Sequence, residues 1–143
     1  MPHSRLIDAN GVLITTLQGV VTIREIAELV AETHNYINDG EILELVLHSD
    51  DVEIALSGIE SVIAADTLKN SLKMVRRGAM AFVSNKDFVY GICRQLQMRV
   101  ENEFLQICVF RTEETARAWL NEMQSSNNGI EQTPGKETTG ISP

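Results

Sequence analysis

The chain has 143 residues, of which 43% are hydrophobic and 22% charged, which is typical of a globular protein. Its 12 basic and 20 acidic residues give a formal net charge of −8, which argues against sequence-independent binding of nucleic acid. The sequence has neither an apolar run long enough for a transmembrane segment nor the apolar region of a signal peptide. Its two cysteines make no disulfide framework, so we expect a reducing, cytoplasmic setting. Residues 124–143 contain few strongly apolar side chains. We therefore predict one domain over residues 1–123 and a flexible C-terminal tail over residues 124–143.

Charge is distributed unevenly along the chain. Residues 1–66 contain two bases and twelve acids, whereas residues 67–111 contain eight bases and three acids. One interpretation is charge complementarity between the two halves of a compact fold. The other is a surface that binds an anion or an acidic partner.

The first predicted elements are a hairpin and a helix. Two apolar stretches, 5–8 and 12–17, flank Asn10-Gly11, a dipeptide typical of hairpin turns because both residues tolerate positive φ. A capping box over residues 22–25 then predicts the start of a helix, and Asp39-Gly40 predicts its end. The apolar run that follows this helix predicts a strand buried on both faces.

The next predicted segment is a loop over residues 48–56. It contains the acidic side chains Asp50, Asp51 and Glu53. Three acids could serve as a cation site or an acid–base pair, but they lack EF-hand spacing and His48 is the one histidine nearby. We therefore interpret this segment as a solvated acidic loop.

A second capping box, over residues 57–60, predicts the start of another helix. The apolar residues of this region fall on two nearly opposite faces, with Ile59, Val62 and Ile63 on one and Leu68, Leu72 and Val75 on the other. Either the helix is apolar on two sides or it breaks near Asp66-Thr67. Because Asp and Thr are good N-cap residues, we expect a break.

Four basic residues follow at the spacing i, i+4, i+7 and i+8, namely Lys69, Lys73, Arg76 and Arg77. If the segment is helical, they share one face. This face is either a solvated basic surface or a patch for an anion, a lipid headgroup or an acidic partner.

The second half of the chain predicts a strand at 79–83, a helix after residue 86, a strand at 105–110 and a final helix from residue 113. The inner face of the final helix is predicted to contain Ala116, Trp119, Leu120 and Met123. We expect Trp119 to be buried, with a partner-binding anchor as the alternative. The complete order, β-β-α-β-α-β-α-β-α, predicts an α/β fold with a mixed sheet and an opening hairpin.

Motifs for catalysis and metal binding are absent from the sequence. Cys93 and Cys108 lie in apolar patterns and are interpreted as buried thiols, and His3, His34 and His48 show no metal spacing with them. Nucleotide-binding glycine loops and supported catalytic triads are also missing. We therefore expect no catalytic residues, no metal and no cofactor.

Three segments resemble the STAS domains, the fold of SpoIIAA-type anti-sigma-factor antagonists, and more closely the poorly characterised SpoIIAA-like bacterial proteins. They are the sequences at 80–85, at 89–94, and at 109–120, where a strand ending in Phe-Arg precedes an acidic helix that closes on Ala-Trp-Leu. The resemblance spans about residues 5 to 122. It implies a STAS-like α/β fold with the element order given above.

The resemblance also implies a function and a site. STAS switches are phosphorylated on a serine at the start of the second helix, and Ser57 occupies this place here, although Leu56 replaces the family's Asp and the second hydroxyl residue is missing. Ser57 is therefore either a plain helix N-cap or a regulatory phosphosite. We expect a non-enzymatic regulatory or protein-interaction module in bacterial signalling, with an unidentified protein partner. The alternative is a small-molecule or lipid carrier, which an apolar cavity would favour.

Self-association is the last expectation from the sequence. The two-faced apolar pattern between Ile59 and Val75, together with the opposite charges of the two halves, predicts a homodimer.

Overall fold

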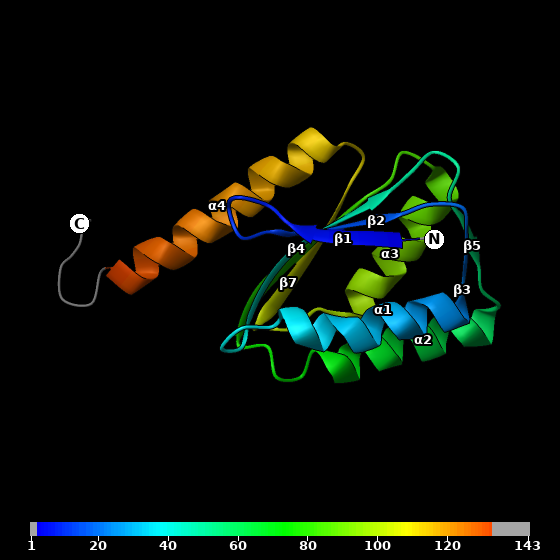
Figure 1. Cartoon of the computed structure of the whole chain (residues 1–143), viewed down its shortest axis with the longest axis horizontal. Coiled ribbons are helices and arrows are strands. Elements are labelled where there is room, and N and C mark those ends of the chain that lie inside the picture. Colours follow the sequence, from blue (N-terminus) through cyan, green and yellow to red (C-terminus); the bar gives the residue numbers. More distant parts are fainter. Residues whose placement is uncertain (1–2, 133–143) are drawn as a thin grey trace.

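The computed structural model describes residues 3–132, and it describes side chains as far as residue 125. A central sheet separates three helices on one face from a single helix on the other (Figure 1). The predicted α/β class with a mixed sheet is confirmed. Among residues 3–132, no helix is long and apolar enough to cross a membrane.

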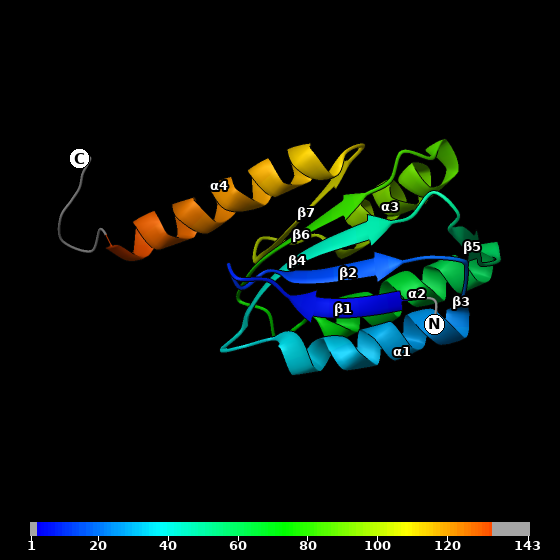
Figure 2. The same cartoon turned by 45° about the horizontal axis from the view of Figure 1, so that its top comes forward.

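The main sheet has five strands, which lie side by side in the order of the chain (Figure 2). They are β1 (His3–Ile7), β2 (Leu13–Leu17), β4 (Glu41–His48), β6 (Arg77–Val83) and β7 (Leu105–Phe110). The β1 strand pairs with β2 in antiparallel orientation, and the other neighbours are parallel. Each parallel step requires a crossover, which the intervening helices provide.

The opening hairpin is present, but its turn differs from the prediction. The strands are in register at Ile7 and Leu13, so the connection is longer than the two-residue turn that Asn-Gly favours. Gly11 has a φ of 82°, whereas Asn10 is not in the left-handed region. The Asp8 side chain organises the turn, because its Oδ1 accepts hydrogen bonds from the backbone N–H groups of Asn10 (2.8 Å) and Val12 (3.0 Å).

Two short strands form a separate parallel pair that the sequence did not predict. The strand β3 (Val20–Thr22) pairs with β5 (Glu53–Ala55), and β5 lies within the stretch 48–56 that we predicted to be a loop. Strands of three residues are too short to show an alternating pattern. This pair joins the segment before the first helix to the segment before the second.

Three helices cover one face of the sheet: α1 (Ile23–Thr33), α2 (Gly58–Ser71) and α3 (Asp87–Val100). A short 3-10 turn, η1 (His34–Tyr36), follows α1. Figures 1 and 2 both show α1 beside α2. The larger hydrophobic core lies between these helices and the inward side chains of the strands.

The helix α2 is continuous, so the predicted break near Asp66-Thr67 is wrong. Its inward face is built mainly from the two small residues Ala64 and Ala65 together with Leu68, all of which are buried. The larger residues on its other face remain exposed, with exposed fractions of 76% for Ile59 and 50% for Ile63. The helix is therefore apolar on two sides, which was the alternative interpretation.

The helix α4 (Glu113–Gln132) covers the opposite face. Ala116 and Leu120 are buried against Leu45 and the alanines of β6. Trp119 is only half-buried, with its ring centroid 5.7 Å from that of Phe110, and it therefore lies at the margin of this core rather than at its centre.

The predicted domain boundary at Gln124 falls inside α4. The helix continues to Gln132, and the Gln124 side chain donates a hydrogen bond to the Asn10 carbonyl (3.1 Å) in the opening hairpin. The first part of the segment 124–143 is thus helical, and the boundary requires correction. Residues 133–143 lie outside the described part of the chain.

The outer edge of β7 is blocked by polar side chains. Ile107 donates its backbone N–H to Glu101 Oε2 (2.9 Å), and its carbonyl accepts a hydrogen bond from Gln97 Nε2 (2.7 Å). Leu105 makes a similar pair of hydrogen bonds with Asn102. These bonds satisfy backbone groups that an edge strand otherwise presents to solvent.

Candidate ligand cavity

A cavity of about 260 Å³ lies between the main sheet and the helices α1, α2 and α3. Its walls are mostly apolar side chains of β2, β4, β6 and the three helices. The exposed residues of its lining all belong to α2 or α3, so the cavity opens between these two helices; they are Gly58, Val62, Gln95 and Arg99. Its volume is larger than the ~150 Å³ that holds benzene and slightly smaller than the ~300–1,000 Å³ typical of drug-sized ligands.

The cavity has one strongly polar region, built around Arg5. This residue lies on β1 opposite Thr15 of β2, and its guanidinium extends over the sheet beneath α1. Arg5 Nε donates to Thr15 Oγ1 (2.9 Å), and Arg5 Nη1 donates to the Leu29 carbonyl (3.0 Å). Arg5 Nη2 donates to Thr33 Oγ1 (2.9 Å) and forms an ion pair with Glu44 Oε2 (3.1 Å). The sheet and α1 therefore hold the guanidinium together.

Glu44 is the buried partner of Arg5. Its side chain is 2% exposed, and it lies on the central strand β4 in a run that is otherwise apolar at its buried positions. Glu44 Oε2 also accepts a hydrogen bond of 2.6 Å from Thr15 Oγ1. Its other oxygen, Oε1, is buried and has no hydrogen-bond partner among the described residues. A buried acceptor left unpaired typically costs about 1–3 kcal/mol, and more when it is charged.

His48 lies four residues after Glu44 on the same face of β4 and also lines the cavity. Its Nδ1 is 2.9 Å from the Val83 carbonyl oxygen, so Nδ1 carries the proton and donates it. Burial lowers the pKa of His48, an effect that this hydrogen bond only partly opposes. The ring is therefore neutral near pH 7, and its Nε2 is an acceptor. Four residues of strand separate the two backbones by about 13 Å, so His48 and Glu44 do not form a catalytic pair.

Cys93 of α3 is a further titratable group in the cavity lining. Its thiol is buried, and burial raises its pKa to about 12. The thiolate is the reactive form of cysteine, so this thiol is not a nucleophile at neutral pH. Cys93 behaves as the small apolar residue that the sequence predicts, whereas Cys108 is half-buried. Within residues 3–132, no group of three or more His, Cys, Asp or Glu could hold a metal ion.

Ser57 is the N-cap of α2, and the predicted capping box is present. Its Oγ accepts a hydrogen bond from the Glu60 backbone N–H (3.1 Å), and its own N–H donates to Glu60 Oε1 (2.9 Å). Ser57 is exposed, and the neighbouring residues Leu56 and Gly58 line the cavity. The serine is therefore close to the cavity without being part of its wall.

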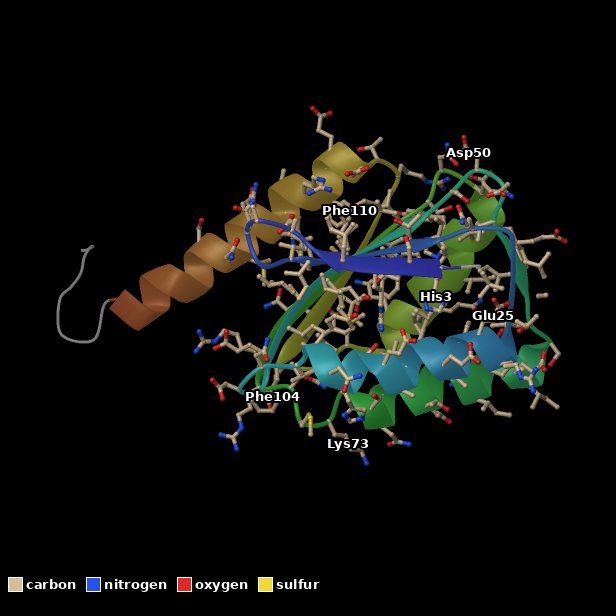
Figure 3. The ribbon with its side chains drawn as sticks, in the orientation of Figure 1. His3, Glu25, Asp50, Lys73, Phe104 and Phe110 are labelled. Carbon is tan, nitrogen blue, oxygen red and sulfur yellow. The ribbon has the colours of Figure 1, made fainter. Side chains whose placement is uncertain are left out.

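The four basic residues do not share one helical face, so this prediction requires correction. The helix α2 ends at Ser71, which leaves Lys69 on the helix while Lys73, Arg76 and Arg77 follow in the turn and at the start of β6. Figure 3 shows Lys73 pointing outward on the lower side of the view, whereas Asp50 lies on the upper side. Arg77 Nη1 lies 3.7 Å from Glu41 Oε2, in an ion pair between the acidic and basic halves of the sequence. None of the four lines the cavity.

The sequence patterns did not predict the two residues that define the polar region of the cavity. Glu44 interrupts an apolar run, and Arg5 is one of two bases in the first 66 residues. A lone acid inside a predicted buried strand is the available signal, because burial requires a partner for its charge. The pattern alone could not identify Arg5, which is 39 positions away from Glu44.

The fold and the site together define an α/β domain with a small internal cavity, apolar on most sides and carrying one buried ion pair. A scan against protein-family models finds no match for the chain, and a search of curated proteins finds none either.

Proposed function

We propose that this protein is a non-enzymatic binding domain that holds a small, mainly apolar molecule in the cavity between the sheet and α1 to α3. The cavity itself is the observation that carries the proposal, because close-packed interiors contain few spaces larger than a water molecule. Its volume suits a ligand of about ten non-hydrogen atoms, judged from the cavity that holds benzene. The cavity is too small for a two-chain lipid, so of the small-molecule and lipid ligands considered for a carrier we propose a small molecule.

A cavity-filling variant tests this proposal. Ala65 is buried on α2 and lines the cavity, so Ala65→Phe places a ring inside it. Thr67 lies on the exposed side of the same helix, and Thr67→Phe adds a ring outside the cavity as the matched control. We expect propylbenzene to raise the melting temperature of the wild type and of Thr67→Phe but not of Ala65→Phe. At about five times its Kd the ligand adds about 1 kcal/mol of stability. Failure of propylbenzene to stabilise the wild type contradicts the proposal.

A second candidate function is protein interaction through α2, which is the function that the STAS resemblance implies. The observation that favours it is the exposed apolar stripe of Ile59, Val62 and Ile63, next to the exposed Ser57. We propose a second copy of the chain as the partner and Ser57 as a phosphosite that would add charge beside this stripe. Sedimentation at micromolar concentration tests the homodimer, with Ile63→Asp as the dissociating variant. A single 15.9 kDa species for the wild type contradicts it.

A further inference from the structure

We propose that the ligand is a small amphipathic carboxylic acid. Its apolar part fills the cavity, and its carboxylate stays at the opening between α2 and α3, where Arg99 binds it. The inference rests on the proposed function, because it requires that the cavity take a ligand. It adds the chemical class of the ligand's polar group and the direction in which the ligand lies.

Arg99 is the charged residue of the lining that has no counter-charge. The lining contains Arg5, Glu44 and Arg99, and the first two form an ion pair of 3.1 Å. Arg99 is exposed on α3, and it makes no hydrogen bond or ion pair with any residue in the described part of the chain. Among residues 3–132, Glu44 is also the one acidic residue that lines the cavity. The opening is therefore positive, opposite in sign to the formal net charge of −8.

Two further side chains add hydrogen-bond donors to the lining at this side. Gln95 precedes Arg99 by four residues, so the two lie on the same side of α3, and both line the opening. Ser61 of α2 is half-buried in the same lining, and its hydroxyl has no partner among residues 3–132. A carboxylate suits these groups, because its two oxygens accept hydrogen bonds and can bind a guanidinium in a planar, bidentate geometry. An amine would instead meet the like charge of Arg99.

The interior of the cavity is less suitable for a charged group. Arg5 is the cation inside, and its charge is already compensated by Glu44 at 3.1 Å and by Glu32 at 3.7 Å. A carboxylate moved into this region would lose its hydration without meeting an excess of positive charge. At the opening Gln95 and Arg99 are both exposed, so a carboxylate bound there keeps its contact with water. The apolar part of the ligand therefore points inward.

Four molecules with nine carbon atoms each test the inference by titration calorimetry on the full chain at about 0.15 M salt, which screens the net charge of the protein. They are propylbenzene, 3-phenylpropan-1-ol, 3-phenylpropylamine and 3-phenylpropanoate. An exposed ion pair of good geometry gives an affinity gain of up to about fivefold. We expect the carboxylate to bind about fivefold more tightly than the alcohol, and the amine to bind more weakly than both.

The Arg99→Gln variant removes the charge at the opening. Arg94→Gln is the matched control, because Arg94 is exposed on the same helix and does not line the cavity. Both variants change the net charge equally, and neither removes a buried side chain. We expect Arg99→Gln to bind the carboxylate no more tightly than the alcohol, with propylbenzene bound as before. Arg94→Gln should keep the wild-type order. Gln95→Glu adds a negative charge beside Arg99 and should bring the affinities of the amine and the carboxylate closer together.

The outcomes separate this inference from the proposed function. Equal affinities of the carboxylate and the alcohol for the wild type would overturn the inference. A preference for the carboxylate that survives Arg99→Gln would overturn it as well, because the carboxylate would then lie elsewhere, such as beside Arg5. In both cases the proposed function stands as long as propylbenzene binds. If none of the four molecules binds, the proposed function fails too.

Discussion

Gly78 lies in a closely packed part of the main sheet, and Gly78→Ala tests this packing directly. The residue is buried on β6, in register with Ile42 of β4 on one side and Leu105 of β7 on the other. An added Cβ would lie 2.9 Å from Val75 Cγ1, 3.0 Å from Ile42 Cγ2 and 3.0 Å from Leu105 Cδ1. The first two atoms belong to β-branched side chains, which cannot move away without a change of rotamer or backbone.

Overpacking of this kind costs about 1–3 kcal/mol, and the less flexible unfolded chain of the alanine variant offsets about 0.4–1 kcal/mol of it. We therefore expect Gly78→Ala to lose about 1–2 kcal/mol of unfolding free energy. In a domain of this size the melting temperature should fall by about 3–8 °C. Thermal unfolding followed by circular dichroism measures this directly.

Gly91 is the matched control, because it lies on the exposed side of α3 and an added Cβ would meet nothing within 4 Å. Alanine is the better helix former, so Gly91→Ala should gain about 0.5–1 kcal/mol. The two variants carry the same chemical change and should shift the melting temperature in opposite directions. A Gly78→Ala protein that unfolds at or above the wild-type temperature would refute the packing argument.

Three further predictions concern the cap, the ion pair and the histidine. Ser57→Ala should lose about 1 kcal/mol in urea unfolding, whereas Ser57→Asp, which can also cap α2, should lose little; equal losses would contradict the cap. Arg5→Met should lose about 3–5 kcal/mol by leaving the buried Glu44 carboxylate without a counter-charge, and adding Glu44→Met should restore most of it; an unrestored double variant would contradict this. Burial lowers the pKa of His48. Below about pH 6.5 the imidazole therefore binds a proton more readily in the unfolded chain than in the native protein, and the free energy of unfolding decreases as the pH is lowered. His48→Asn, which keeps a donor for the Val83 carbonyl, should show a shallower fall between pH 7 and 5, and equal slopes would count against the assignment.

The main sheet could be predicted because its strands carry strong local patterns. The run 105–110 alternates buried and outward-facing residues, and 79–83 is apolar throughout because it forms a strand with a helix on each face. The start of α2 was predictable for a similar reason, since a capping box is complete within four residues. The continuation of α2 past Asp66-Thr67 could not be predicted in this way. Large exposed side chains such as Ile59 and Ile63 outweigh the small buried Ala64 and Ala65 in any apolar pattern, and so they suggest a break that packing does not require.

The candidate site was less predictable because it depends on contacts distant in sequence. The apolar walls of the cavity consist of residues that also serve as an ordinary core, and no pattern distinguishes a filled core from one that leaves a space. The Glu44 pair with Arg5 joins β4 to the edge strand β1 across Thr15, and this contact exists only after the hairpin has packed against the central strand. The basic residues after Lys69 illustrate the opposite error. Their regular spacing suggested a shared helical face, but the helix ends at Ser71, before three of the four residues.

Because the outer edge of β7 is blocked, a strand from another molecule could be added at only one edge of the main sheet. Gln97 and Glu101 already occupy the backbone groups of Ile107 that a strand from another molecule would need. An added strand would therefore have to join at β1, the opposite end of the sheet. That position is next to Arg5, so a partner that extended the sheet would lie directly beside the ion pair at the polar end of the cavity. Ligand occupancy and strand addition would thus act on the same residue, although one approaches from inside the domain and the other from outside.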